Sequence, residues 1–297
     1  MRAVVIEEGR VAVRERPDPV PGTGEVLVRV HAAGINNADL MQAAGNYPPP
    51  PGVPEDQPGL EAAGEVVGTG QRVMALLPGA AQSELVAVDE RHLLPVPDEV
   101  DWPAAGGFME AFATAHDAVF TQAELRPGER LLVNGAAGGV GTAAVQLALA
   151  AGAEVTGTAR SDESRARLAA LGASTEADGA YDVILELVGG ELLTRDLEQL
   201  APHGRLVVIG TGAGARAQVD FHLVMRKRLR LLGSTLRARS AEEKALVVAR
   251  LGADALPLLA AGRVAVHVQR TFPLEQAQAA YEAFAAGGKF GKLVLVA

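Results

Sequence analysis

The chain has 297 residues, 48% of them hydrophobic, and a formal net charge of −9. This length suits two domains, and the negative charge argues against electrostatic binding to nucleic acid or to an anionic membrane. The absence of cysteine excludes disulfides, thiolate nucleophiles and cysteine-ligated metals. No apolar run approaches the length of a membrane span and the N-terminus enters a strand at once, so we expect a cytoplasmic protein.

The first third of the chain is rich in predicted strands. Its apolar stretches alternate or are β-branched, and Pro, Gly and Asp separate them. Between the third and fourth stretches, Asn46–Pro58 contains six prolines, which predicts an irregular surface loop. The predicted strands of this part are residues 3–7, 11–15, 25–32, 65–67, 71–75 and 84–88.

From about residue 104 the pattern changes to helices alternating with strands, which predicts a parallel, doubly wound sheet. The fold class is therefore α/β, with a β-rich domain built from residues 1–112 and 241–297 and a nucleotide-binding domain at 113–240. In this middle part the predicted helices are 108–121, 140–151, 164–171 and 191–200, and the predicted strands are 131–133, 154–159, 183–187, 205–209 and 229–233. The last part carries predicted helices at 242–251 and 274–285 and strands near 264–268 and at 292–296.

The run Leu131–Gly141, with the sequence LLVNGAAGGVG, joins a short apolar strand to a helix through a glycine-rich turn. Such a turn lets a pyrophosphate approach the backbone, and the helix N-terminus offers unpaired N–H groups and a positive dipole end. An ordinary tight turn with no ligand is the alternative, because glycine spacing alone is a weak indication. The following strand at 154–159 completes a βαβ unit and favours dinucleotide binding. The residues that we expect at the phosphates are Gly138, Gly139, Val140 and Gly141.

The end of the second strand of this unit indicates which dinucleotide is bound. A site for NAD usually has Asp or Glu there, whereas this strand runs through Thr158 into Arg160 and Ser161. A guanidinium at this position would pair with a 2′-phosphate. Ser161 is the expected N-cap of the next helix, on which Arg165 lies near the phosphate. The sequence thus favours NADPH, although Arg160 as a solvated loop residue remains the alternative.

Seven segments spread over the chain carry a family resemblance: GINNADLMQAAGNYPPPPG, PGLEAAGEVVG, MALLPGAAQSELVAV, AAGGVGTAAVQLA, LVVIGTGAG, LLGSTLRARSAEEKA and FGKLVLV. Together they resemble the zinc-free quinone oxidoreductase branch (zeta-crystallin-like) of the medium-chain dehydrogenase/reductase superfamily. Within that branch they are most similar to the damage-inducible quinone oxidoreductase-like group. The resemblance implies a GroES-like catalytic domain, a Rossmann domain, and a cleft between them in which NADPH reduces a small quinone or conjugated carbonyl. It also implies a homodimer or homotetramer formed by edge strands, with 207–209 or 229–233 near the contact.

The same resemblance shows where this chain departs from zinc-dependent alcohol dehydrogenases. Asn36, Leu60 and Glu110 stand at the positions of their catalytic zinc ligands, and the four-cysteine structural lobe is absent. Leucine cannot ligate zinc, and one carboxylate beside one amide makes a poor site. The resemblance therefore implies hydride delivery to an acceptor that is already electrophilic, without a metal.

The resemblance assigns positioning roles toward acceptor and nicotinamide to Asn36 and Thr114, and Tyr47 could stack its ring on a planar acceptor and donate its hydroxyl. Capping of a helix is the alternative for Asn36 and for its neighbour Asp39, and Tyr47 is equally expected to pack against the proline loop. Lys292 matches a position close to the coenzyme, with a surface charge as its alternative. The full set expected at the coenzyme is Asn36, Thr114, Gly138, Gly139, Val140, Gly141, Thr158, Arg160, Ser161, Arg165, Gly210, Thr211, Gly212, Ser234, Thr235, Leu236 and Lys292.

Other motifs support no further chemistry. The six histidines lack metal-ligand spacing, and only His116 merits testing as a proton donor. The basic run Arg226–Arg230 is better explained as a solvated face or domain-interface patch than as a nucleic-acid contact. Two rival functions remain: an enoyl-thioester or alkenal double-bond reductase, and a non-catalytic dinucleotide-binding or structural protein.

Overall fold

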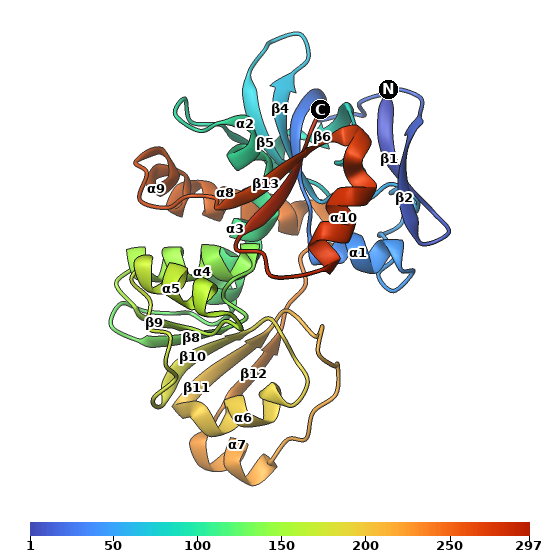
Figure 1. The fold of residues 1–297 in the computed structure, drawn as a ribbon. Coiled ribbons are helices and arrows are strands. Elements are labelled where there is room, and N and C mark those ends of the chain that lie inside the picture. The colour runs from blue at the N-terminus through green and yellow to red at the C-terminus, as the bar shows by residue number, and fades with distance from the viewer. The chain divides into compact units, whose positions relative to one another are not determined.

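A computed structural model describes residues 1–297, and the chain forms two compact units. Unit 1 contains Met1–Ala113 and Leu236–Ala297, and unit 2 contains Thr114–Thr235. Both chain ends belong to unit 1 (Figure 1). None of the helices combines the length and the apolar character that crossing a membrane requires.

Unit 1 is built on a mainly antiparallel sheet with the strand order β13-β14-β3-β4-β5-β7, in which β6 also pairs with β3. A separate hairpin joins β1 and β2, and only β13 and β14 run parallel. The bounds are β1 Arg2–Glu7, β2 Arg10–Glu15, β3 Glu25–Gly34, β4 Glu61–Val66, β5 Arg72–Leu76, β6 Leu85–Asp89, β7 Leu93–Pro95, β13 Val268–Pro273 and β14 Lys292–Val296.

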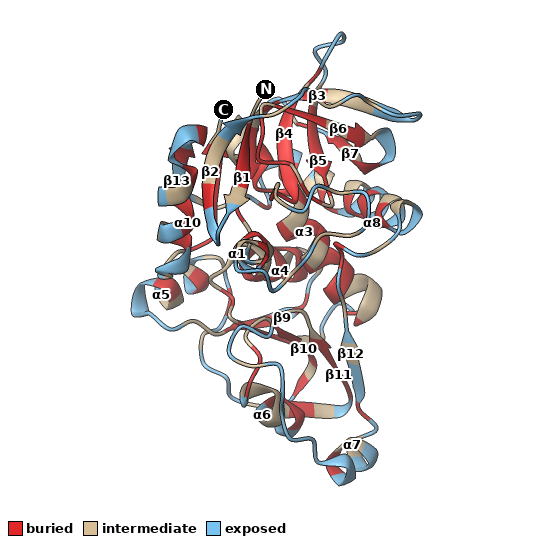
Figure 2. Cartoon of the chain, turned by 90° about the vertical axis from the view of Figure 1, so that its right-hand side faces the viewer, coloured by how far each residue is buried: buried red, intermediate tan, exposed pale blue.

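The helices of unit 1 cover this sheet with narrow apolar faces. In α10 the buried residues Ala277, Ala280, Tyr281 and Phe284 recur at helical spacing, and they pack with residues of β1, β2, β13 and β14 in one core (Figure 2). The helices are α1 Asn37–Ala43, α2 Trp102–Gly106, α3 Met109–His116 (which continues into unit 2), α8 Ala241–Asp254, α9 Leu256–Ala260 and α10 Ala277–Ala285, with 3-10 turns η1 Glu90–His92 and η3 Leu274–Gln276.

Unit 2 is a five-stranded, wholly parallel sheet with the order β12-β11-β10-β8-β9. Helices α4 and α5 lie on one face of the sheet and α6 and α7 on the other (Figure 1). The bounds are η2 Asp117–Gln122 (a π-helix), β8 Arg130–Asn134, α4 Gly139–Ala150, β9 Glu154–Gly157, α5 Asp162–Ala170, β10 Tyr181–Glu186, α6 Leu192–Gln199, β11 Leu200–Val208, α7 Phe221–Lys227 and β12 Arg230–Gly233.

The predicted doubly wound sheet is confirmed, but several elements differ from prediction. The helix expected at 108–121 is two segments, because the π-helix η2 takes over after His116. The prediction of a strand at 264–268 is wrong, since β13 begins only at Val268. Helix α7 was not predicted, and it covers part of the basic run. Lys227 at its end donates to the carbonyl oxygens of Leu200 and Glu198 at 2.6 and 2.8 Å, so this cation caps backbone at the end of α6.

The strand order also corrects one expected subunit contact. Residues 207–209 cannot offer an unpaired edge, because β11 is hydrogen-bonded to β10 on one side and to β12 on the other. Of the two expected segments, only 229–233 lies at an edge of the sheet, where Leu231 of β12 has 42% of its surface exposed.

Candidate active site

The glycine turn of unit 2 lies between β8 and α4, as the sequence predicts. Gly141 is tightly packed, because a Cβ there would stand 2.6 Å from Ala136 Cα. Gly138 is open, since no atom lies nearer than 3.9 Å to the position of its Cβ. No side chain caps the start of α4, so the first N–H groups of the helix are free for an anionic ligand. One glycine is therefore needed for packing, and the other leaves room at the helix end.

Thr158 supports this turn from the neighbouring chain segment. The Gly135 N–H donates to Thr158 Oγ1 at 3.2 Å, and that hydroxyl donates to Asn134 Oδ1 at 3.1 Å. The Ala136 N–H donates to the Thr158 carbonyl at 2.9 Å. The predicted coenzyme residue Thr158 thus fixes the shape of the turn through both its backbone and its side chain.

A buried pair of carboxyl groups at the end of β10 was not predicted. Asn134 Nδ2 donates at 2.8 Å to both Glu186 Oε2 and Asp196 Oδ1. The other oxygen of Glu186 accepts from the backbone N–H groups of Val188 and Gly189, which holds the loop that follows β10. Burial, and then the adjacent Glu186, raise the pKa of Asp196 to about 8. The pair therefore holds one proton at neutral pH. A long-range pair of acids leaves no local sequence pattern that would reveal it.

The residues expected at the 2′-phosphate have different surroundings. Ser161 caps α5, as predicted, by accepting from the Ser164 N–H at 3.2 Å. Arg165 is committed to the protein, because it donates to the carbonyls of Ala159 and Arg160 at 2.9 and 3.1 Å and pairs with Asp162. The Arg160 side chain is exposed and makes no hydrogen bond or ion pair, so its guanidinium is available.

The other expected residues of unit 2 lie at the carboxyl edge of the same sheet. Gly210 is the second residue after β11, and a Cβ there would stand 2.2 Å from the Leu187 carbonyl oxygen. Ser234 follows β12 and donates to Asp117 Oδ2 at 3.3 Å, while Thr235 is exposed. This edge is where open parallel sheets bind their ligands. The remaining residues placed there are Thr211 and Gly212, both exposed; Thr114 is half-buried on α3.

Unit 1 contains a buried charged cluster around Lys292 on β14. The Lys292 ammonium donates to Glu61 Oε1 at 2.5 Å, to Asn36 Oδ1 at 2.6 Å and to the Ile35 carbonyl at 3.0 Å. The side chains of Lys292 and Glu61 are only 3% and 0% exposed. The alternative of a surface charge for Lys292 is therefore wrong. Asn36 Nδ2 donates to Glu61 Oε1 at 3.0 Å, so both ends of the amide are fixed.

Asp39 acts as the capping residue of α1, in line with the alternative given for it. Its carboxylate accepts from the Asn36 N–H at 2.7 Å and from the Gly59 N–H at 2.9 Å. Burial raises the pKa of Asp39 to about 6, and the two backbone hydrogen bonds oppose that rise. Asn36 is thus held by its backbone through Asp39 and by its side chain through Lys292 and Glu61.

Tyr47 is half-buried in the proline loop, beside an arginine that the sequence analysis did not single out. Arg237 donates to the Tyr47 carbonyl at 3.0 Å, to the Pro78 carbonyl at 2.8 Å and to Gln42 Oε1 at 2.6 Å. Its guanidinium carbon also stands 5.3 Å from the centre of the Tyr47 ring. Arg237 therefore ties the loop to α1, and its buried neighbour Leu236 begins the returning part of unit 1.

Comparison with known proteins identifies the family of this chain. Residues 22–98 match the alcohol dehydrogenase GroES-like domain, and residues 157–295 match the zinc-binding dehydrogenase family. The quinone oxidoreductase of Mus musculus is 30% identical, over 94% of this chain and 91% of that protein. The crystal structure of the quinone oxidoreductase from Thermus thermophilus, also described in complex with NADPH, is 34% identical with a TM-score of 0.88 over 100% of both chains.

This chain belongs to the quinone oxidoreductase family of the medium-chain dehydrogenase/reductase superfamily. The expected fold class, a GroES-like domain with a Rossmann domain, is confirmed by these matches. A 35% identical segment that covers 92% of this chain also occurs in the spectinabilin polyketide synthase system protein NorB of Streptomyces orinoci, where it makes up 13% of the protein.

In this member of the family, the residues at the zinc-ligand positions do not suit zinc. Leu60 offers no donor atom, and Asn36 Oδ1 already accepts from the Lys292 ammonium at 2.6 Å. A dication at that oxygen would stand beside a buried positive charge. The chain has no group of three or more His, Cys, Asp or Glu side chains that could hold a metal ion. The donor set thus does not fit the metal after which the matching family is named.

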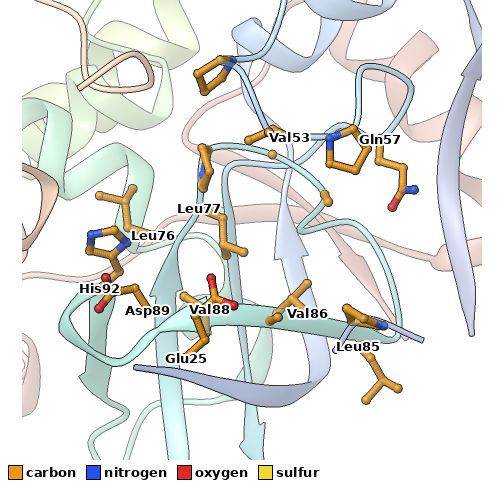
Figure 3. Close-up of a pocket in the computed structure, with 18 of the residues that line it drawn as sticks. Glu25, Val53, Gln57, Leu76, Leu77, Leu85, Val86, Val88, Asp89 and His92 are labelled. Carbon is orange, nitrogen blue, oxygen red and sulfur yellow. The ribbon is translucent and has the colours of Figure 1, made fainter. Parts of the chain in front are cut away.

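Unit 1 also contains a groove of about 680 Å³ that includes none of the predicted site residues (Figure 3). Val53 and Gln57 of the proline loop face a wall that contains Leu76, Leu77 and Val88. Two of its polar side chains are already engaged. Asp89 pairs with Arg91 at 2.6 Å, and His92 Nε2 stands 2.8 Å from the Ala241 carbonyl. Because none of the predicted site residues lines the groove, it is separate from the candidate active site.

Proposed function

We propose that this chain is an NADPH-dependent quinone oxidoreductase that reduces a small quinone or conjugated carbonyl without zinc. The observation that carries the proposal is the 34% identity over the full length of both chains with the Thermus quinone oxidoreductase, which is described in complex with NADPH. The three site features above agree with it: an open glycine turn, an available guanidinium after β9 and a rigid polar cluster in unit 1.

For the coenzyme, the residues of unit 2 offer a fitting set of contacts. The free N–H groups at the start of α4 suit the pyrophosphate, and Gly138 leaves space for it. The unpaired Arg160 suits a 2′-phosphate, which favours NADPH over NADH. The further contacts that we propose come from Gly139, Val140, Gly141, Thr158, Ser161, Arg165, Gly210, Thr211, Gly212, Ser234 and Thr235.

When bound, the reduced nicotinamide supplies a hydride. The acceptor must be held in line with it, which is a matter of orientation because a quinone or enone is already electrophilic. Asn36 suits this positioning role, since Lys292 and Glu61 fix its amide. We assign further positioning roles to Tyr47, Thr114, Leu236 and Lys292. The donor set supports the proposed zinc independence, because leucine and an amide that is already hydrogen-bonded make poor ligands for a dication.

The test has two steps. Fluorescence titration of the purified protein with NADPH and NADH is expected to show binding of both and tighter binding of NADPH. Oxidation of NADPH is then followed in parallel with 1,2-naphthoquinone and with crotonyl-CoA as acceptors. Turnover with the quinone supports the proposal, and failure to bind either coenzyme would overturn it.

A second candidate is reduction of an enoyl thioester. It is favoured by the 35% identical segment within a polyketide synthase polypeptide. A clear preference for crotonyl-CoA over the quinone would establish this function instead. Tight NADPH binding without turnover of any electrophile would point to the non-catalytic role.

We also propose a homodimer or homotetramer that pairs the exposed edge of β12. This strand uses only one of its sides within unit 2, and Leu231 on it is exposed. An unpaired strand edge of this kind is a template for pairing with a second copy.

A further inference from the structure

Glu110, the second residue of α3, is an acid that none of the positioning roles above uses. Its backbone N–H donates to Glu61 Oε2 at 2.9 Å, whereas the other oxygen of Glu61 accepts from Asn36 Nδ2 at 3.0 Å. One buried carboxylate therefore fixes both the amide of Asn36 and the backbone of Glu110. Glu110 is therefore held beside Asn36, the residue that we propose positions the acceptor.

Glu110 is half-buried, which removes much of its hydration, and its carboxyl group makes no hydrogen bond. The carboxyl is thus free to turn toward a ligand, in contrast to Glu61 and Asp39, whose oxygens are all engaged by backbone or side-chain donors. Among the acids of this cluster, Glu110 is the one whose carboxyl group makes no hydrogen bond.

The surroundings of Glu110 favour its protonated form. Loss of hydration, and then the negative charge of Glu61, raise its pKa to about 8, while Lys292 opposes the rise. The other charges that act on it are Asp39 on α1, Arg237 after β12 and Lys244 on α8. A carboxyl group that is neutral near pH 7 can donate a proton, which an ordinary carboxylate cannot.

We propose that Glu110 is the general acid that protonates the reduced acceptor. This inference rests on the proposed function. A quinone that accepts a hydride, and with it two electrons, becomes a hydroquinone monoanion. The carboxyl O–H of Glu110 breaks as its proton moves to the phenolate oxygen, which gives the neutral hydroquinone. Water returns the proton to the Glu110 carboxylate. With a conjugated carbonyl, the same proton goes to the enolate that hydride addition leaves.

The test compares Glu110→Gln and Glu110→Asp with the wild-type protein, with 1,2-naphthoquinone as the acceptor. Glu99→Gln is the matched control, because Glu99 is exposed and has no hydrogen bond or ion pair. We expect Glu110→Gln to lower kcat by about a hundredfold, Glu110→Asp to retain part of it, and Glu99→Gln to leave it unchanged. In the wild type, kcat should fall as the pH rises through about 8, the value at which Glu110 loses its proton. Glu110→Gln should lack this fall.

A second measurement needs neither coenzyme nor turnover. Infrared difference spectra of the wild-type apoprotein against Glu110→Gln should show the carbonyl stretch of a protonated carboxylic acid near neutral pH, and this band should disappear in alkaline buffer. Fluorescence titration should give the same NADPH affinity for both proteins, and thermal melting should show that both are folded.

The outcomes separate the two proposals. If the wild-type protein oxidises NADPH with the quinone, and Glu110→Gln does so with the same kcat and pH profile, the role of Glu110 is wrong and the proposed function stands. If the wild-type protein binds no coenzyme or reduces no acceptor, both proposals are wrong. Absence of the infrared band at neutral pH would also overturn the role of Glu110 as an acid.

Discussion

Lys292 and Glu61 form an ion pair that is almost wholly removed from water. Removing one partner of such a pair leaves the other charge buried and uncompensated. We predict that Lys292→Met lowers the free energy of unfolding by about 3–5 kcal/mol, measured by urea titration. Lys289→Met is the control. Lys289 lies over the Phe284 ring at 3.5 Å, and its loss should cost about 1 kcal/mol. Equal effects of the two substitutions would contradict the view that burial makes the pair important.

Arg160 is the one candidate for 2′-phosphate recognition that no other group in the protein engages. We predict that Arg160→Ala weakens NADPH binding about tenfold or more, because a charge-assisted hydrogen bond contributes about 1.5–3 kcal/mol. Fluorescence titration with NADH provides the internal control, since that coenzyme lacks the phosphate and should bind with unchanged affinity. A parallel loss of NADH affinity would mean that Arg160 supports the fold and does not select the coenzyme.

The turn that leads into helix α4 contains two glycines with different roles. We predict that Gly141→Ala destabilises the protein by about 1–3 kcal/mol, because its Cβ would press on the Ala136 backbone. Gly138→Ala should change the unfolding free energy by less than about 1 kcal/mol, since its Cβ meets open space. It should nevertheless weaken NADPH binding by narrowing the room for the pyrophosphate. Urea titration and fluorescence titration of the two variants separate these effects, and unchanged coenzyme affinity in Gly138→Ala would contradict pyrophosphate binding at this turn.

Asp196 makes the stability of the folded protein depend on pH. Its pKa in the folded state is about 8, above the ordinary value of 3.8, so folding takes up a proton between these two values. The contribution of Asp196 to the free energy of unfolding is fully present below about pH 4 and is lost as the pH rises through about 8. We predict that Asp196→Asn, which cannot ionise, gains stability over the wild type as the pH rises across this range. The gain is on the order of a few kcal/mol, at about 1.4 kcal/mol for each pKa unit.

Urea titrations of the wild type and Asp196→Asn at acidic, neutral and alkaline pH measure this difference. The matched control is Asp98→Asn, which replaces an exposed carboxylate. Its difference from the wild type should not vary with pH in the same way. A constant difference between Asp196→Asn and the wild type would show that Asp196 is already ionised at neutral pH.

Assembly is the second property of the whole molecule that the structure makes testable. If the edge of β12 joins two copies, a charge on it should oppose pairing. We predict that Leu231→Lys shifts the protein to a smaller species in sedimentation velocity at micromolar concentration. Leu246→Lys is the control, because Leu246 is an exposed leucine on α8 of unit 1 with 59% of its surface accessible. A wild-type protein that sediments as a monomer would contradict the proposed assembly.

The sequence by itself determined the alternation of strands and helices in unit 2, the glycine turn, the Ser161 cap and the final strand 292–296. These features depend on local periodicity, capping and turn chemistry, which act over a few neighbouring residues. The order of the seven motifs along the chain also indicated the family. The strand expected at 264–268 and the missed helix α7 lie in stretches where local patterns are weak or misleading.

Only the tertiary structure brought together Lys292 with Glu61, Asn134 with Asp196, and Arg237 with Tyr47, because each pair is separated by tens to hundreds of residues along the chain. These pairs matter for stability because their charged and polar groups are removed from water. That burial depends on how whole helices and strands pack, and no local sequence pattern reveals it. The same packing made Glu110 a neutral acid, a property that its place in the sequence does not show.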